Sequence, residues 1–244
     1  MTSKVLAILG AFDVDHRELT LTELAHRAHL TLSTAQRRAA EMTGWGALER
    51  TDDGRYRVGL RLWEVGSLAP RGVGLREVAL PFLEDLYVVS RQNVQLAVRE
   101  GIEVVFVERI AGRSAVPVLT RVGGRFALHA TGVGLVLLAF APPEVFDEVV
   151  SAGLKAYTPA TITDPEVLRR VLAEVRREGY VVSRGAVTED ALSVAAPVTD
   201  QDGKVIAAVS LVVAEKDARP QALAPLVRAA ARGISRTHAM YGKP

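Results

Sequence analysis

The 244-residue sequence predicts an α+β protein of two domains: a small helical module, then a larger domain with a mainly antiparallel sheet and flanking helices. Three observations lead to this prediction. Short helical patterns and a hairpin pattern fill roughly the first quarter of the chain. Glycine and proline then cluster in GSLAPRGVG, residues 66–74, as in a connection between domains. Beyond this cluster, strand-like and helix-like segments alternate to the C-terminus.

Three short helices are expected at the N-terminus, because apolar residues recur at helical spacing in three groups: Val5, Ile8, Leu9 and Phe12; Leu21, Leu24, Ala25 and Ala28; Ala35, Ala39 and Met42. Thr20 or Thr22 is the expected N-cap of the second helix, and Thr31 or Ser33 that of the third. Helices of this length are unstable alone, so these must pack on one another.

The third helix has a side suited to contact DNA. At about 100° per residue its apolar positions turn inward, so Arg37 points directly away from the body, and Arg38 lies nearer the packed side. Arginine binds guanine edges or phosphates, and glutamine and threonine suit adenine edges or phosphates. The alternative is an exposed amphipathic helix with solvated arginines. The candidate DNA-contacting residues of this helix are Ser33, Thr34, Gln36, Arg37 and Arg38.

A β-hairpin is expected next, because strand-like residues 47–51 and 55–58 flank the turn signal Asp52-Asp53-Gly54. Arg55 and Arg57 alternate along the second strand and face one side, where they contact the DNA backbone or only decorate a solvated strand. Helices followed by such a hairpin form a winged helix-turn-helix, which places one helix in the DNA major groove. Residues 1–66 hold nine basic and nine acidic residues, so nonspecific affinity should be modest.

Composition narrows the class of protein. The chain is 49% hydrophobic and 24% charged, with a net charge of +2. No apolar run approaches ~18 residues, so we expect no membrane contact. The first residues lack a signal-peptide pattern, and a cytoplasmic location is expected. With no cysteine, the chain has no disulfide, thiolate nucleophile or cysteine metal site.

A helical linker is expected at residues 67–79, and a second domain at 80–244. In this domain, antiparallel strands with helices on the sheet favour an α+β sensor domain. The expected strands are residues 93–99, 102–110, 116–121, 180–183, 191–199 and 204–214. The expected helices are residues 129–140, a segment after Pro142, residues 165–178 and residues 221–241.

The last two strands predict a face of small residues. Asp202-Gly203 is a two-residue turn signal, which places Gln201 opposite Lys204. The same register pairs Ser193 with Val212, Ala195 with Ser210 and Pro197 with Ala208. One face then carries Ala191, Ser193, Ala195, Ala208 and Ser210, and the other carries Leu192, Val194, Val198, Val209, Leu211 and Val213. The small face leaves volume for a ligand, or it lets a helix pack closely; both alternatives stay open.

The sequence resembles the IclR family of bacterial transcription regulators along nearly its whole length. The matching stretches are LTLSTAQRR, GALER, GRYRVGLRLWEVGS, GGRFALHATGVGLVLLAF, REGYVVSRG and AAPVTDQDGKVIAAVSLVV. The resemblance implies a winged helix-turn-helix, a linker helix and a GAF-like effector-binding domain. It also implies homodimers or tetramers, operator DNA as partner, and control of a nearby metabolic operon by a small molecule.

Carried over by position, the resemblance implies that Thr34 and Arg37 contact DNA, with Ser33 and Gln36 beside them. It also implies an effector cup lined by Ser183, Ser193, Ser210 and a wall at residues 128–132. The candidate effector-binding residues are Leu128, Ala130, Thr131, Gly132, Ser183, Ala191, Ser193, Ser210 and Val212.

The sequence departs from the family pattern at informative positions. Arg38 and Ala39 stand where the family usually has two leucines, so Arg38 reaches a phosphate or an acid such as Glu41. Ser193 replaces a frequent cysteine, and Ser183 stands where some members have aspartate. The cup is therefore expected to bind a less polar effector, such as an aromatic or acyl metabolite with a carboxylate or amide end.

Other classes of function fit less well. The chain has no G-x-S-x-G elbow and no cysteine nucleophile, so we expect no enzyme. Gly132-Val133-Gly134 lacks a full anion-binding fingerprint, His26 and His29 lack a third metal ligand, and no cofactor is expected. A winged helix used for protein contacts is the remaining alternative. The protein is expected to be a regulator, most simply a repressor. Its dimer would place the two copies of the third helix roughly 34 Å apart.

Overall fold

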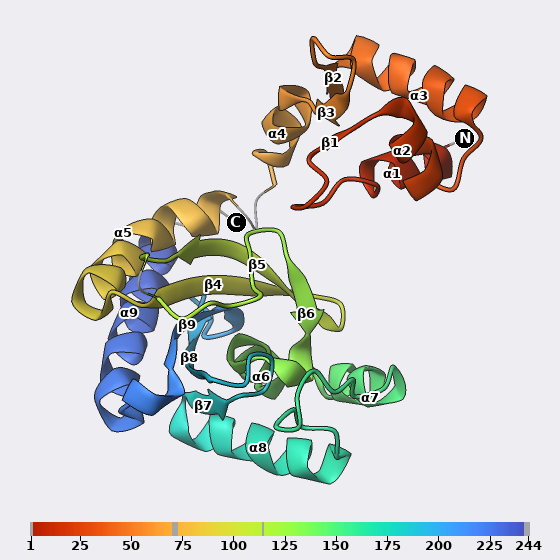
Figure 1. Ribbon diagram of the computed structural model, residues 1–244. Helices are drawn as coiled ribbons and strands as arrows, with labels where there is room; N and C mark the ends of the chain where they lie inside the picture. The colour runs from red at the N-terminus through yellow and green to blue at the C-terminus, as the bar shows by residue number, and fades with distance from the viewer. Residues whose placement is uncertain (1, 70–72, 114, 242–244) are drawn as a thin grey trace. The chain divides into compact units, whose positions relative to one another are not determined.

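The computed structural model describes residues 2–69, 73–113 and 115–241 and divides the chain into two compact units, Met1–Pro70 and Arg71–Pro244. Each unit has its own sheet and its own hydrophobic core (Figure 1). Among the described helices, none combines the length and the hydrophobicity that a membrane span requires.

The N-terminal unit contains helices packed against a small antiparallel sheet of strand order β1-β3-β2. Its elements are α1 (Thr2–Leu9), β1 (Glu18–Leu19), α2 (Leu21–Arg27), α3 (Leu32–Trp45), β2 (Leu48–Arg50), β3 (Tyr56–Val58) and α4 (Leu60–Gly66). The predicted helices and hairpin are therefore present. The two-residue strand β1 was not predicted, because two residues are too few to show an alternating pattern.

Side-chain caps fix where the helices of this unit begin. Thr20 caps α2 in a capping box: its hydroxyl accepts from the backbone N–H of Glu23, and the Glu23 carboxylate accepts from the backbone N–H of Thr20. Thr31 caps α3 by accepting from the backbone N–H of Thr34. Gly46, with φ of 89°, ends α3 in the left-handed conformation. Each of the two N-caps, Thr20 and Thr31, is one of the two candidates predicted for its helix.

The C-terminal unit has a six-stranded antiparallel sheet of order β6-β5-β4-β9-β8-β7. Its strands are β4 (Asn93–Glu100), β5 (Glu103–Ile110), β6 (Arg125–Ala127), β7 (Val181–Arg184), β8 (Ala191–Thr199) and β9 (Val205–Ala214). Its helices are α5 (Val73–Ser90), η1 (Leu128–Ala130), α6 (Gly132–Ala139), α7 (Pro143–Ser151), α8 (Pro165–Glu178), η2 (Glu215–Asp217) and α9 (Pro220–Tyr241).

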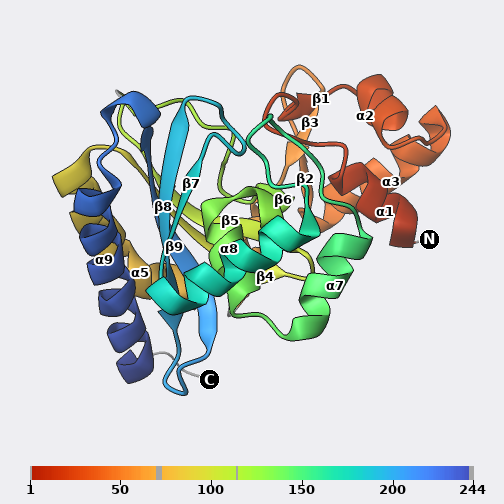
Figure 2. The ribbon, with the colours of Figure 1, turned by 90° about the horizontal axis from the view of Figure 1, so that it is seen from below.

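The two faces of this sheet are covered differently. Figure 2 shows α5 and α9 together on one face, and α6, α7 and α8 on the other. The face under α5 and α9 carries the large side chains predicted to be core, among them Leu192, Val194 and Leu211. The opposite face carries the small residues Ala195 and Ala208, on which α6 packs.

Two expectations for the C-terminal unit are wrong. Residues 116–121 do not form a strand; side chains of β4 hold this segment instead, Asn93 donating to the Val116 carbonyl and Gln95 donating to the Thr120 hydroxyl. The helix expected at 129–140 is divided into η1 and α6, because Thr131 turns the chain and caps α6. The short strand β6 was not predicted.

The expected linker overlaps α5. Residues 73–79 lie in this helix, and Leu75 and Ala79 are buried in the core of the C-terminal unit. Residues 70–72 of the expected linker lie outside the described residues. The helical part of the linker after residue 72 thus contributes to the packing of the second unit.

The register between β8 and β9 was predicted correctly, but the turn was not. Asp200, rather than Gln201, pairs with Lys204, because the loop has three residues and ends on Gly203 at φ of 78°. A β-bulge between Val198 and Thr199 compensates for this shift. Beyond the bulge, Ser193 pairs with Val212, Ala195 with Ser210 and Pro197 with Ala208.

Candidate DNA interface and ligand pocket

The exposed side of α3 carries the polar residues predicted to contact DNA. Ser33, Gln36 and Arg37 are exposed, and Thr34 is half-buried, with its hydroxyl bonded to the capping hydroxyl of Thr31. Among the described residues, no acidic side chain pairs with Arg37, so its guanidinium is not neutralised within the unit. The inward positions Ala35, Ala39 and Met42 are all buried, as the periodicity predicted.

Arg38 does not share this exposed side. Its side chain is only 7% exposed, and its Nη1 pairs with Glu41 Oε2 at 2.5 Å. Its Nε is buried without a hydrogen-bond partner among the described residues. Of the two partners expected for Arg38, a phosphate or Glu41, the structure shows Glu41, so the expected DNA contact is corrected to this ion pair. Arg38 follows Arg37 by about 100° on α3 and therefore lies on the packed side, as the periodicity predicted.

The hairpin places Arg55 and Arg57 on its surface, but each lies beside acids. Arg57 pairs with Glu49 at 2.9 Å, and Arg55 lies 3.5 Å from Glu23 and 3.4 Å from Asp53. Glu49 also accepts from the backbone N–H of Leu60, and this bond, with that from Arg57, lowers the pKa of Glu49. Both arginines remain at least 40% exposed, so they can exchange these partners for phosphates.

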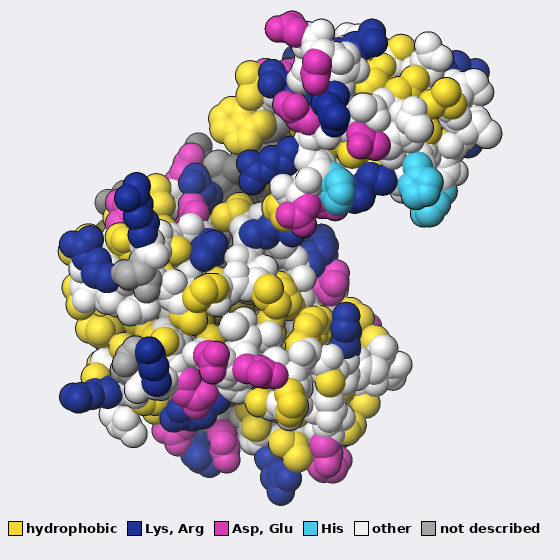
Figure 3. Space-filling model, in the orientation of Figure 1, with side chains coloured by type: hydrophobic (Ala, Val, Ile, Leu, Met, Phe, Trp, Pro, Cys, Tyr) yellow, Lys and Arg dark blue, Asp and Glu magenta, His cyan; other side chains and the backbone are white. Residues whose placement is uncertain are grey.

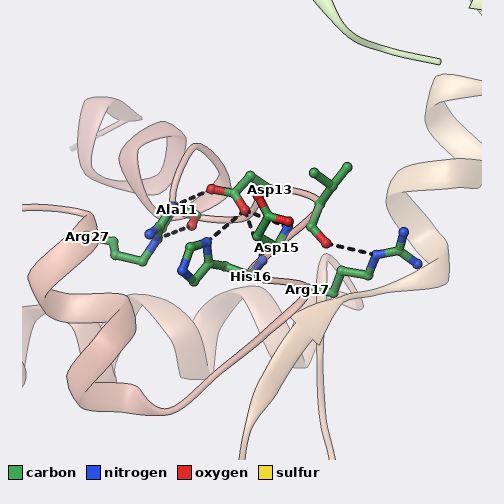
Figure 4. Close-up of polar contacts among 7 residues, drawn as sticks. Ala11, Asp13, Asp15, His16, Arg17 and Arg27 are labelled. Atoms are coloured by element: carbon green, nitrogen blue, oxygen red, sulfur yellow. Dashed lines mark hydrogen bonds and ion pairs between the residues drawn. The ribbon is translucent and has the colours of Figure 1, made fainter. Parts of the chain in front are cut away.

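The loop between α1 and β1 is held by a single carboxylate (Figure 4). Asp13 Oδ1 accepts from the backbone N–H groups of Asp15 and His16 and lies 2.8 Å from His16 Nδ1. Its Oδ2 pairs with Arg27 of α2 at 2.6 Å, and Arg27 also donates to the Ala11 carbonyl. The bond from His16 is the main cause that lowers the pKa of Asp13. The loop thereby ties α1 to α2, against which α3 packs.

Hydrophobic side chains gather on the surface over α4 (Figure 3). Leu60, Trp63, Val65 and Leu68 are between 50% and 78% exposed, and Trp45 at the end of α3 is 52% exposed. No side chain of α4 is buried. An apolar patch of this kind on a soluble protein marks a contact with another molecule.

A pocket lies in the C-terminal unit between the small-residue face of the sheet and the start of α6. It contains about 450 Å³ of empty space, part of it open to solvent. It is lined by Gln95, Phe106, Val118, Thr120, Ala130, Thr131, Gly132, Val133, Ser183, Ala186, Val187, Thr188, Ala191, Ser193 and Val212.

Seven of the nine candidate effector-binding residues line this pocket: Ala130, Thr131, Gly132, Ser183, Ala191, Ser193 and Val212. The other two lie behind its wall. Leu128 is fully buried in the core, and Ser210 is 1% exposed and donates to Gln95 at 3.4 Å. Sequence reasoning missed Gln95 and Phe106 on neighbouring strands, and also the segments at 118–120 and 186–188, which have no periodic pattern.

The small-residue face both packs against α6 and borders the pocket. A Cβ added to Gly132 would lie 2.7 Å from Ser193 Oγ and 3.5 Å from Ala195 Cβ, so α6 packs closely on β8. The pocket opens beside this contact. Thr131 caps α6 by accepting from the Gly134 N–H, and the preceding backbone N–H groups at Gly132 and Val133 are those that a helix start leaves without intrahelical partners.

The pocket is apolar, with neutral polar groups. No charged side chain lines it in the described part of the chain. Its apolar lining includes Phe106, Val118, Val133 and Val212, and its hydroxyl-bearing residues are Thr120, Thr131, Ser183, Thr188 and Ser193. A negatively charged ligand group would be stabilised here by the start of α6, where backbone N–H groups and the helix dipole favour anions.

The described residues contain no cluster of three or more histidine, cysteine, aspartate and glutamate residues that could hold a metal ion. His129 is 1% exposed, and its Nε2 bonds the Lys155 carbonyl at 3.0 Å, a structural role beside the pocket. His26 and His29 are exposed.

Comparison with known proteins decides the family. The bacterial transcriptional regulator IclR C-terminal domain matches residues 69–236, and the IclR helix-turn-helix domain matches residues 2–52. The chain belongs to the IclR family. Its curated relatives include the HTH-type transcriptional regulator XynR of Escherichia coli (30% identical; 85% of this chain and 83% of the relative). The HTH-type transcriptional repressor AllR of Klebsiella pneumoniae is also 30% identical (94% of this chain, 86% of the relative).

Solved structures of the IclR family have the same fold. An IclR homologue from Microbacterium hydrocarbonoxydans, solved in complex with 4-hydroxybenzoate, is 42% identical with a TM-score of 0.92 over 97% of this chain and 98% of its own. The Thermotoga maritima IclR is 27% identical with a TM-score of 0.81, covering 98% of each chain. The expected fold is therefore confirmed: a helix-turn-helix domain followed by a domain with a curled antiparallel sheet and helices.

Proposed function

We propose that this IclR-family protein is a sequence-specific DNA-binding regulator, most simply a repressor, that inserts α3 into the major groove of its operator. The observation that carries the proposal is the orientation of α3. Its apolar side is buried in the core, while Ser33, Gln36 and the unpaired Arg37 are exposed together. Arginine and glutamine are side chains that read guanine and adenine edges there. Arg55 and Arg57 on the hairpin supply phosphate contacts.

The effector that the pocket supports best is a small aromatic acid. The lining is apolar and includes Phe106, which suits a ring, and it has no charged side chain in the described structure. A carboxylate is then held by neutral donors, the start of α6 and the Ser193 hydroxyl, rather than by an ion pair. The structural relative with 42% identity was solved with 4-hydroxybenzoate, a compound of this class.

A homodimer, or a tetramer built from two dimers, follows from the surface of the N-terminal unit. The exposed apolar side chains over α4, Trp63 above all, are costly in a monomer and are covered by a second copy. Two copies present two α3 helices to a pseudo-palindromic operator, with half-sites about one turn of DNA apart. Effector binding changes operator affinity by favouring one arrangement of the subunits. The protein acts in the cytoplasm, where the operator lies.

The test of DNA reading is the substitution Arg37→Ala in the full chain. We expect specific binding to the duplex upstream of its own gene to weaken by roughly 5- to 150-fold, because a bidentate contact to guanine is worth about 1–3 kcal/mol. Arg37→Lys keeps the charge but not the fork of donors, so it should restore only nonspecific binding. Fluorescence anisotropy with operator and scrambled duplexes measures both.

Arg99→Ala is the matched control, since Arg99 is an arginine of the C-terminal unit whose Nη1 donates to the nearby Gly101 carbonyl. This control should bind the operator like the unchanged protein. If Arg37→Ala retains both its fold and full operator affinity, α3 does not read DNA. The winged helix then serves protein contacts, which is the competing proposal.

A further inference from the structure

We infer that Gln95 and Thr120 form a recognition site for a hydroxyl group on the ring of the effector. This inference rests on the aromatic acid of the proposed function and deepens it. Neither residue belongs to the small-residue face predicted from the sequence. Both line the pocket, Gln95 from β4 and Thr120 from the segment that follows β5.

The side-chain amide of Gln95 is buried in the C-terminal unit. It is 3% exposed and shares its face of the sheet with the fully buried Ala97 and with Ser210, its partner on β9. Burying an amide without hydrogen bonds is costly. Gln95 Nε2 donates to Thr120 Oγ1 at 2.5 Å, and Gln95 Oε1 accepts from Ser210 Oγ at the long distance of 3.4 Å.

These bonds leave hydrogen-bonding capacity at the pocket wall. A glutamine amide supplies two N–H donors and two acceptor lone pairs, and the described residues use one donor and one lone pair. The Thr120 hydroxyl accepts from Gln95, so its own proton is still available to donate. One end of the pocket thus offers both an acceptor and donors, and both come from neutral groups.

A ring hydroxyl fits this end because it donates and accepts at once. A methyl or hydrogen in its place would leave the second N–H and the second lone pair of Gln95 without a partner in the pocket. The distance from this end of the pocket to the start of α6 also fits an aromatic acid. Gln95 on β4 lies two strands from Ala195 on β8, where α6 begins, roughly 10 Å between backbones. Side chains fill part of this gap, so a carboxylate and a hydroxyl at opposite positions of one ring match the two ends.

A purely structural role for Gln95 makes a different prediction. Asn93 on the same strand bonds the Val116 carbonyl, so both amides hold the segment at 116–120 over the sheet. If Gln95 only held this segment, its removal would weaken binding of all ligands alike. A recognition role changes the ratio between ligands that differ only in the ring substituent.

The experiment is calorimetric titration of the full chain with benzoate, 4-methylbenzoate and 4-hydroxybenzoate. We expect 4-hydroxybenzoate to bind roughly tenfold more tightly than the other two, the worth of about one net hydrogen bond at the upper end of its range. Gln95→Met removes the amide at nearly constant volume and should reduce this preference to less than about threefold, with benzoate affinity little changed. Gln92→Met makes the same change outside the pocket and should keep the preference.

Thr120→Val is a second, independent test that remains available if Gln95→Met does not fold. It should also reduce the preference for 4-hydroxybenzoate. Equal affinity of the unchanged protein for all three ligands overturns this inference alone and leaves the aromatic acid standing. Equal weakening of all three by both variants also overturns it and assigns Gln95 the structural role. Failure of the unchanged protein to bind any of the three overturns the proposed aromatic acid and this inference together.

Discussion

Arg37 and Arg38 are adjacent arginines that α3 places in opposite environments. A rotation of about 100° separates them, so Arg37 lies on the exposed side, while the Arg38 side chain is 7% exposed and pairs with Glu41. A buried guanidinium is a weak source of stability, because the desolvation cost opposes the attraction of its partner. The unbonded Nε of Arg38 adds to this cost.

Arg38→Leu should therefore leave the fold and operator affinity intact, and change the free energy of unfolding by no more than about 1 kcal/mol in either direction. Glu41→Gln, which leaves the buried guanidinium without its partner charge, should lower stability by about 1 kcal/mol; the half exposure of Glu41 keeps the effect small. Both tryptophans, Trp45 and Trp63, lie in the N-terminal unit, so urea unfolding followed by tryptophan fluorescence measures this unit.

Operator binding separates the two arginines. A loss of affinity in Arg38→Leu as large as that in Arg37→Ala would show that Arg38 leaves Glu41 and reaches the DNA in the complex. The predicted difference depends on the environment of each residue, since the two side chains are chemically identical.

At the scale of secondary-structure elements, regular segments with clear end signals were predictable from the sequence. The helix expected at residues 165–178 is α8, which Asp164 caps, Pro165 begins and Gly179 ends. The strands β8 and β9 alternate large and small residues, so both faces followed from the sequence, and their register held because a bulge offsets the error in the predicted turn. The face argument selected Ser193 for the pocket, whereas Ser183 and Val212 came from the resemblance to the IclR family.

The segments that were missed depend on tertiary contacts. The sequence of residues 116–121 is typical of a strand, but side chains of β4 bond this segment, and it joins no strand of the sheet. Gln95 was missed for the same reason, because its partner Thr120 is 25 residues away in the chain. Local periodicity carries none of this information.

The loop before β1 is an element held by charge, and it predicts a dependence of stability on pH. The hydrogen bond from His16, helped by the Asp15 backbone and the charge of Arg27, lowers the pKa of Asp13 in the folded protein. A carboxylate with a lowered folded pKa stabilises the protein above its unfolded pKa, about 3.9, and this contribution is lost as the pH falls through the folded pKa.

Asp13→Asn should therefore unfold at lower urea than the unchanged protein at pH 7, and the gap should narrow as the pH falls below about 4. Asp15→Asn, which removes a charge from the same loop without breaking the contact to Arg27, is the control and should cause little change. A gap that stays constant from pH 7 to well below 4 would mean that the Asp13 carboxylate contributes no stability of its own.

At the scale of the whole molecule, the N-terminal unit is nearly neutral and the pocket lies in the other unit. Residues 1–66 hold nine basic and nine acidic residues, and the hairpin arginines lie beside acids. In the proposed regulator, long-range attraction to DNA is therefore weak, and operator affinity would depend on a few contacts from α3 and the hairpin. Such an interface would be readily controlled, because a small change in the separation of the two α3 helices of the proposed dimer would remove a large share of its contacts.

This proposed control predicts an equality that can be measured. If a saturating aromatic acid changes the operator dissociation constant by some factor, the operator duplex must change the dissociation constant of the acid by the same factor. Coupling between sites is typically 5–150-fold. Anisotropy measures the first factor and calorimetry the second. In Arg37→Ala the acid should bind as before while the duplex no longer alters its affinity; two unequal factors, or none at all, would contradict coupling of the pocket to α3.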